Sequence, residues 1–260
     1  MGHAHAPIRL RHGRGGFTLI ELLVALSVIA LLIGLMIPAV SRVRDTTHRV
    51  ICSSNVRQIG LGIAMYADDY DGRLPRSIFI SDMREASSDE AMLETVRLRL
   101  AADSVLLAEY NPHGGGGAAA SKARSGGVWD GLGLLFNGEY LAARGVFYCP
   151  SHNGENRLAD AGESAWTSTT DDLIGNYQYR AQGSDRSNML WRIDPRESVL
   201  VSDSLRPEDE LNHEDGANTL RADLAVLWYA DAGEQLLALS RTGQTRRAWE
   251  LLDERADSPD

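Results

Sequence analysis

Cysteine is scarce in this chain of 260 residues, which contains only Cys52 and Cys149. Two cysteines are too few for a zinc ribbon or for a densely disulfide-bonded scaffold. In an exported domain they can form a single bridge, and otherwise they would be two buried free thiols. The sequence leaves both alternatives open.

Positive charge is also in short supply, because 36 Asp and Glu residues outnumber 26 Lys and Arg residues and the net charge is −10. Such a balance repels phosphates, so we expect no nucleic-acid partner. It is typical of a soluble surface, with cation binding as the second interpretation. Two catalytic signatures are missing as well, since the sequence contains neither Gly-x-Ser-x-Gly nor His-Glu-x-x-His.

Only one long hydrophobic run is present, at residues 17–40, and it contains a single charged residue, Glu21. About 20 apolar residues in a helix span a bilayer. Residues 1–16 carry three arginines and no acid, so the positive-inside rule keeps them in the cytoplasm and sends the rest across. A plain signal anchor would explain these features. It would not explain a carboxylate in the membrane, which costs free energy and usually marks a function.

The residues around this carboxylate, Gly16-Phe17-Thr18-Leu19-Ile20-Glu21, resemble the processing site of type IV prepilins and type II secretion pseudopilins. The resemblance implies that a membrane peptidase cuts between Gly16 and Phe17 and methylates the new N-terminus. Glu21 would then be the fifth residue, and its carboxylate would pair with the amine of a neighbouring subunit. Pro38 matches a proline that many family members carry in this helix.

The helical pattern continues beyond the membrane segment, with an apolar residue at every third or fourth position. These residues are Cys52, Val56, Ile59, Ile63 and Tyr66. We expect one helix from Phe17 to about Ala67, kinked at Pro38, whose second half needs a sheet to cover its apolar stripe. The resemblance implies the same α+β, pilin-like fold, in which a long N-terminal helix packs on a small antiparallel sheet with helical and loop insertions.

The predicted organisation has four parts. They are a cytoplasmic leader at 1–16, a transmembrane helix at 17–40, an exported continuation of the helix at 41–72, and an exported globular domain at 73–260. Acids close the long helix at Asp68-Asp69-Tyr70-Asp71-Gly72, but their spacing does not fit an EF-hand. We interpret Gly72 as a helix stop and expect no cofactor and no metal, with calcium at these acids as the alternative.

Hydrophobic patterning also predicts the elements of the exported domain. Helices are expected at 82–110, near 132–135 and at 233–256. Short strands are expected at 146–149, 176–180 and 198–202, and two more flank a turn at Asp223-Leu224, the second of them at 225–229. A glycine-rich loop occupies 111–127.

A second resemblance lies near the C-terminus. A subgroup of large prepilin-like proteins carries a His, nine residues and then Asp-Gly, with a Cys-Pro pair upstream, and His213, Asp223 and Cys149-Pro150 match this pattern. Leu224 stands where the subgroup has glycine. Asp-Gly suits a tight hairpin because both residues accept a positive φ, which leucine does poorly. The departure therefore bears on the geometry of this turn.

The features together predict a structural subunit, either a minor pilin or a pseudopilin of a type II secretion or type IV pilus-like system. The expected partners are the prepilin peptidase and methyltransferase, other pilin or pseudopilin subunits, and inner-membrane lipid. The protein would cross the inner membrane once, with its N-terminus in the cytoplasm and its bulk in the periplasm or outside the cell.

Two other functions remain open. One is a membrane-anchored extracytoplasmic binding domain that does not polymerise, and the other is an exported hydrolase. The hydrolase would use Asp203, Ser204 and His213 as a triad, or His213, Asp215 and Asp223 as a metal site. Residue type is the only support for it, so we expect no enzyme activity and no catalytic residues.

Overall fold

A computed structural model describes residues 18–80, 88–101, 127–168, 170–203, 205, 212–213 and 215–256. The chain divides into two units, residues 1–45 and 46–260, each of which is described by itself. The predicted leader lies outside the described residues, and so does the glycine-rich loop apart from Gly127.

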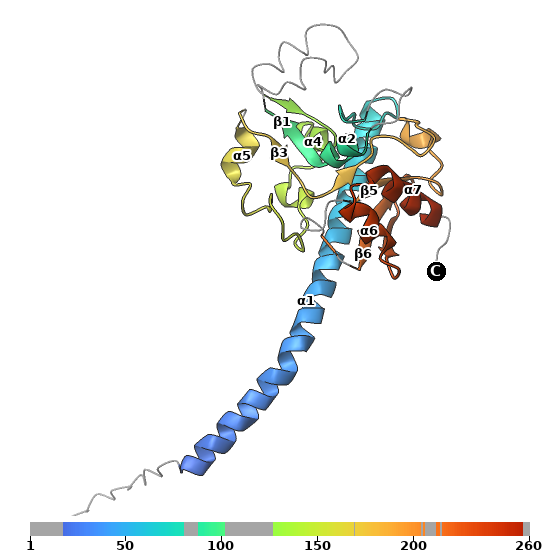
Figure 1. Cartoon of the computed structure of the whole chain (residues 1–260). Coiled ribbons are helices and arrows are strands. Elements are labelled where there is room, and N and C mark those ends of the chain that lie inside the picture. Colours follow the sequence, from blue (N-terminus) through green and yellow to red (C-terminus); the bar gives the residue numbers. More distant parts are fainter. Residues whose placement is uncertain are drawn as a thin grey trace, which may run out of the picture. The chain divides into compact units, whose positions relative to one another are not determined.

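Helix α1 runs from Leu19 to Asp69, which confirms the long N-terminal helix expected from the sequence (Figure 1). Pro38 lies within it. In the second unit α1 buries one face, and the predicted stripe is confirmed there. Its fully buried apolar residues recur at helical spacing: Cys52, Val56, Ile59, Ile63 and Ala67.

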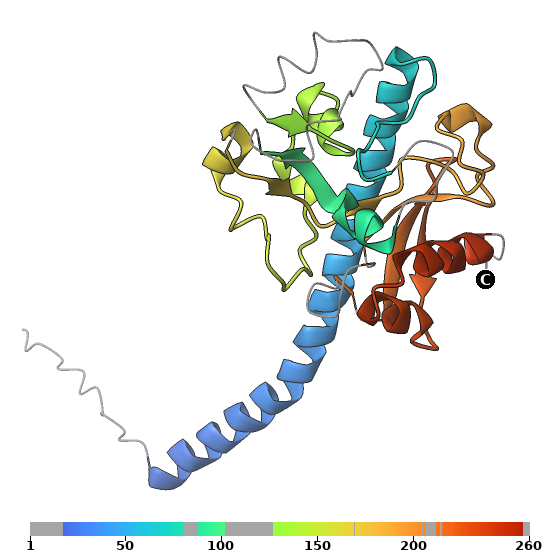
Figure 2. The same ribbon diagram turned by 45° about the horizontal axis from the view of Figure 1, so that its top comes forward.

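Two glycines let other elements approach this buried part of α1 closely. A Cβ added at Gly60 would lie 2.8 Å from the side chain of Leu220, and one at Gly62 would lie 2.9 Å from the side chain of Leu141. Leu220 and Leu141 belong to different parts of the domain, which lie on two sides of this part of α1 (Figure 2).

The first layer is a four-stranded antiparallel sheet with the order β4-β5-β6-β7. Its strands are β4 (Gln178–Tyr179), β5 (Val199–Ser202), β6 (Gly216–Arg221) and β7 (Val226–Ala230). Three of them coincide with strands predicted at 176–180, 198–202 and 225–229, while β6 begins just after His213. Leu220 on β6 is fully buried and provides the contact with α1.

The hairpin between β6 and β7 shows how the chain accommodates leucine in place of the family glycine. Leu224 adopts a φ of 68°, in the left-handed region. Its N–H donates to the carbonyl of Arg221 at 3.0 Å, and the carboxylate of Asp223 accepts from the N–H of Ala225 at 3.0 Å. The turn therefore forms at the predicted place, with leucine in a conformation that costs about 1–2 kcal/mol for a residue with a Cβ.

The second layer is a three-stranded antiparallel sheet with the order β2-β1-β3. Its strands are β1 (Arg97–Leu100), β2 (Val128–Trp129) and β3 (Leu173–Ile174). The helix predicted at 82–110 is wrong at Arg97–Leu100, which form β1, while residues 82–87 and 102–110 lie outside the described residues. Within residues 88–96, the helical part consists of α2 (Asp89–Leu93) and a 3-10 turn (Glu94–Val96).

Strand pairing prevails over the helical pattern because β1 is buried between two partners, β2 and β3. Even Arg99 is only 1% exposed. Its guanidinium donates to the carbonyls of Ala165, Trp166 and Asp171 at 2.7–3.3 Å. Such a long-range network has no signature in the local sequence.

Two further predictions need correction. Residues 146–149 do not form a strand, because a 3-10 helix occupies Arg144–Phe147. The single helix expected at 233–256 is two helices, α6 (Gln235–Arg241) and α7 (Thr245–Ala256), separated at Gly243, whose φ is +68°. The short helix expected near residue 134 is confirmed as α4 (Gly133–Asn137). The remaining short elements are α5 (Glu163–Thr167) and a 3-10 turn at Leu190–Arg192.

Side chains of opposite charge fix α7 to the rest of the domain. The carboxylate of Asp253 pairs with the Arg180 guanidinium at 2.6 Å and accepts from the backbone N–H of Val199 at 2.8 Å. Burial raises the pKa of Asp253, although Arg180 acts in the opposite direction. The pair thus joins α7 to the strand region around β4 and β5.

The acidic end of α1 has the geometry of a helix stop. Gly72 has a φ of +82°, and its N–H donates to the carbonyl of Ala67 at 2.7 Å. The carboxylate of Asp69 accepts a hydrogen bond from the Tyr140 hydroxyl at 2.6 Å. These contacts account for Gly72 as a helix terminator and give Asp69 a hydrogen-bond partner.

Candidate functional site

The N-terminal site lies at the start of α1. Gly16 and Phe17 lie outside the described residues, which begin at Thr18. The Glu21 carboxylate accepts hydrogen bonds from the backbone N–H and the hydroxyl of Thr18, both at 2.8 Å. The N–H of Glu21 in turn donates to the Thr18 hydroxyl oxygen at 3.3 Å.

This reciprocal arrangement is a capping box, in which Thr and a Glu three residues later satisfy free N–H groups of the first helical turn. The positive end of the helix dipole also favours a carboxylate there. The sequence Thr-x-x-Glu carries the signature of a capping box, which is a local signal that could have predicted this contact. Glu21 therefore has hydrogen-bond donors within its own chain before any partner subunit is considered.

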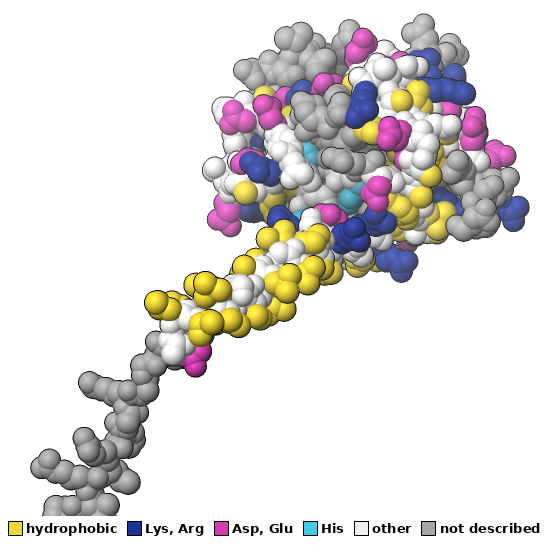
Figure 3. All heavy atoms as spheres, turned by 60° about the horizontal axis from the view of Figure 1, so that its bottom comes forward, with side chains coloured by type: hydrophobic (Ala, Val, Ile, Leu, Met, Phe, Trp, Pro, Cys, Tyr) yellow, Lys and Arg dark blue, Asp and Glu magenta, His cyan; other side chains and the backbone are white. Residues whose placement is uncertain are grey.

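The surface of α1 that follows is apolar on all sides. Large hydrophobic side chains from Leu19 to Val40 are exposed, and Figure 3 shows them along this part of the helix. The most apolar stretch of 18 residues has a mean hydropathy of 2.8, and none of it is buried. The helix is long and apolar enough there to cross a membrane, which fits a single-pass anchor.

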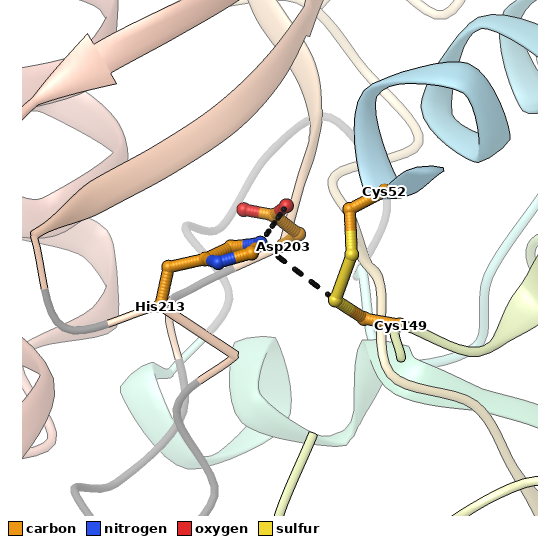
Figure 4. Close-up of side chains that lie close together, drawn as sticks. All are labelled: Cys52, Cys149, Asp203 and His213. Carbon is orange, nitrogen blue, oxygen red and sulfur yellow. Dashed lines mark hydrogen bonds and ion pairs between the residues drawn. A yellow bond between two sulfur atoms is a disulfide. The ribbon is translucent and has the colours of Figure 1, made fainter. Parts of the chain in front are cut away.

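A second cluster of chemically active side chains lies in the compact unit of residues 46–260 (Figure 4). A disulfide joins Cys52 on α1 to Cys149, across 97 residues of sequence, with the two Cα atoms 5.3 Å apart. The sequence left open a disulfide bridge or two free thiols, and the structure contains the bridge. The bond ties the long helix to the segment that follows the Arg144–Phe147 turn.

His213 and Asp203 lie against this disulfide. Nε2 of His213 is 3.3 Å from Oδ2 of Asp203 and 3.7 Å from Sγ of Cys149. Asn218 on β6 orients Asp203, because its backbone N–H and its side-chain amide each donate to the carboxylate at 2.7 Å. The motif histidine therefore meets the cysteine of the Cys-Pro pair, while Asp203 is the carboxylate beside it.

The same corner contains a contact between α1 and the hairpin. The Arg49 guanidinium lies over the Trp228 ring, 3.8 Å from its centroid, and pairs with the carboxylate of Asp215. Trp228 also meets the His213 ring edge to face, with centroids 5.5 Å apart. Cation–π and ionic contacts thus reinforce the attachment of α1 that the disulfide provides.

The other motif residue, Asp223, has a different role. Its carboxylate pairs with Arg221 at 2.8 Å and caps the hairpin turn. The sequence suggested a metal site made of His213, Asp215 and Asp223. Among the described residues, the ligand atoms that converge belong to a different group. That group consists of Cys52, Cys149, Asp203 and His213.

The geometry also bears on the hydrolase alternative. In a catalytic triad the carboxylate and the nucleophile contact different nitrogens of the histidine. Here Asp203 and Cys149 both face Nε2, and Ser204 lies outside the described residues. The arrangement of Asp203, His213 and Cys149 is thus not that of a triad.

Comparison with known proteins identifies the N-terminal segment. Residues 11–37 match the family described as the prokaryotic N-terminal methylation motif. No curated protein and no solved structure matches the chain. The motif indicates a structural pilin subunit that is processed and methylated. The chain therefore carries the prepilin-type N-terminal motif, followed by a long apolar helix, as type IV prepilins and pseudopilins do.

Proposed function

We propose that this protein is a minor pilin or pseudopilin of a type II secretion or type IV pilus-like system, cleaved after Gly16 and methylated on Phe17. One observation carries the proposal. The methylation motif at residues 11–37 overlaps the first part of α1, where the apolar side chains from Leu19 to Val40 are exposed all round and Glu21 is the single acid among them.

Cleavage would create the partner that Glu21 needs. The new α-amine at Phe17 is a cation in a region of lipid, and the carboxylate is an anion there. Pairing between neighbouring subunits offsets the desolvation of both charges and fixes the axial stagger of the subunits. The apolar surface of α1 would pack against the same surface of other subunits or against lipid.

The disulfide supports export of the globular domain, because disulfides persist in oxidising compartments outside the cytoplasm. The N-terminus would stay in the cytoplasm until the prepilin peptidase removes the leader. The proposed neighbours are then inner-membrane lipid and other pilin or pseudopilin subunits.

Processing is tested by the intact mass of full-length protein extracted from the membranes of cells that contain a prepilin peptidase. We expect a chain that begins at N-methylated Phe17. Gly16→Leu is the matched control, because it blocks cleavage and retains the leader. Wild-type protein that keeps residues 1–16 in such cells would contradict the proposal.

Assembly is tested with two substitutions at the capping box. If Glu21 pairs with an amine of another subunit, Glu21→Ala removes the protein from sheared filaments while membrane insertion and cleavage continue. Thr18→Ala removes the hydroxyl of the capping box but leaves the backbone N–H of residue 18 and the Glu21 carboxylate, so incorporation should persist. Ser27→Ala, further along the same helix, is the control for general effects of a substitution on α1.

The outcomes separate the proposal from its alternatives. Equal loss in Thr18→Ala and Glu21→Ala would assign Glu21 to helix capping alone. Processed wild-type protein that never enters a filament would indicate an anchored binding domain that does not polymerise.

A further inference from the structure

We propose that the Cys52–Cys149 corner is a latent zinc site, in which the reduced protein binds one Zn²⁺ through Cys52, Cys149, Asp203 and His213. This inference does not depend on filament assembly, because all four residues belong to the compact unit of residues 46–260.

The four ligand atoms come from separate parts of the chain and converge on one place. All of them lie within 4.8 Å of one another. Cys52 is on α1, Cys149 follows a 3-10 helix, Asp203 follows β5, and His213 precedes β6. Two sulfurs, one imidazole nitrogen and one carboxylate oxygen form a donor set typical of four-coordinate Zn²⁺.

The orientation of His213 favours a shared metal over a proton relay. Its Nε2 faces both the Asp203 carboxylate oxygen and the Cys149 sulfur, at 3.3 and 3.7 Å. A metal ion bound by this nitrogen would have the oxygen and the sulfur on its other sides. A relay would instead use the two ring nitrogens for different partners.

Groups around the cluster hold two of the ligands in place, as the hydrogen-bonding neighbours of metal ligands do at zinc sites. Asn218 donates to both oxygens of Asp203, and Trp228 packs edge to face on the His213 ring. The side chains of Asp203 and His213 are 0% and 6% exposed. Asp203 and His213 are therefore held in position and largely closed to water, while the two sulfurs become available as ligands only when the disulfide is reduced.

The disulfide and the metal exclude each other. A dithiol reductant would give two electrons to the Cys52–Cys149 bond and become a disulfide itself, leaving two protonated thiols. Each thiol then releases its proton to solvent as its sulfur binds Zn²⁺. Either the covalent bond or the metal would thus fasten α1 to the same segments of the domain.

The test uses full-length protein in detergent, reduced with a phosphine that becomes its oxide, with the oxygen supplied by water. Zn²⁺ is measured by elemental analysis after gel filtration, and Co²⁺ serves as a spectroscopic probe. We expect one bound ion per reduced chain, with sulfur-to-cobalt charge-transfer bands and strong visible bands of a tetrahedral site. The oxidised protein should bind none.

Variants assign the ligands. His213→Ala and Asp203→Asn should each weaken binding by more than about tenfold, because even the loss of a group that only orients a metal ligand has an effect of that size. Asp215→Asn is the matched control, since Asp215 lies two residues from His213 but pairs with Arg49. It should leave the affinity unchanged.

Circular dichroism keeps the test decisive if reduction disturbs the fold. Reduced protein that regains its native spectrum on addition of one equivalent of Zn²⁺ supports the proposal, since such metal binding is coupled to folding. Reduced wild type that binds no Zn²⁺ or Co²⁺ overturns it. A cobalt spectrum without thiolate bands, or one unaffected by His213→Ala, overturns it as well.

Discussion

Removal of the Cys52–Cys149 bridge should destabilise the exported domain strongly. The bond closes a loop of 97 residues. In the chain-entropy relation, closing a loop of this length lowers the entropy of the unfolded chain and thereby stabilises the folded domain by about 4.7 kcal/mol. A domain has about 5–15 kcal/mol of stability in total, so the double variant Cys52→Ala with Cys149→Ala would lose a large share of it.

The native contacts around the bridge should nevertheless keep the variant folded in water. Val56, Ile59 and Ile63 of α1 remain buried in the core, and the Arg49 contact with Trp228 does not involve the sulfurs. Alanine is chosen because a serine hydroxyl at these buried positions would add a desolvation cost of its own. The expected effect is therefore a shift of the unfolding transition without loss of the native spectrum.

Urea titration of the full chain in mild detergent, followed by tryptophan fluorescence, measures this loss. All five tryptophans lie in the exported domain, at positions 129, 166, 191, 228 and 249, so the signal reports on that domain. Reduced wild type with a metal chelator is the second comparison and should behave like the double variant. A loss below about 1 kcal/mol in both samples would refute the loop-entropy reasoning.

Two smaller predictions concern a turn and a tyrosine. Leu224→Gly should stabilise the domain by about 0.5 kcal/mol. The strain energy relieved at the left-handed backbone, φ 68°, exceeds the entropic cost of the extra freedom that glycine gives the unfolded chain. In the same urea titration the control Ala222→Gly, at a position where φ is not positive, should destabilise the domain. Tyr140→Phe should cost about 1 kcal/mol below pH 10, through loss of the bond to Asp69. That bond raises the pKa of Tyr140 from 10.0 to about 12, so its stabilisation disappears as the pH rises from 10 through about 12. Stability curves of wild type and Tyr140→Phe that stay parallel over this range would contradict the assignment.

Local patterns predicted what depends on neighbours in sequence. The apolar run, the stripe from Cys52 to Tyr66 and the alternation in residues 198–202 each gave the correct element. The failures have two causes, tertiary pairing in one case and a local break in a helix in the other. Residues 97–100 form a strand between two partners although their apolar spacing also fits a helix, and a glycine at 243 divides what reads as one amphipathic helix.

The residues around the disulfide could not be predicted as one site for the same reason, because tertiary structure brings them together. His213 and Cys149 were singled out as motif residues, but their partners were not predictable. His213 lies 64 residues from Cys149, and Asn218 orients Asp203 from a neighbouring strand. Only the register of β5 against β6 brings Asp203, Asn218 and the residues before β6 together.

The capping box changes the argument for Glu21. From the sequence alone, we expected the carboxylate in the apolar segment to pair with a cation from another subunit. In the folded chain, Thr18 already donates two hydrogen bonds to it. Hydrogen bonds from neutral groups satisfy lone pairs but leave the net charge in place, whereas an amine removes it. The capped carboxylate is thus suited to a monomer that waits in the membrane, and the charge that remains favours the pairing proposed for the filament.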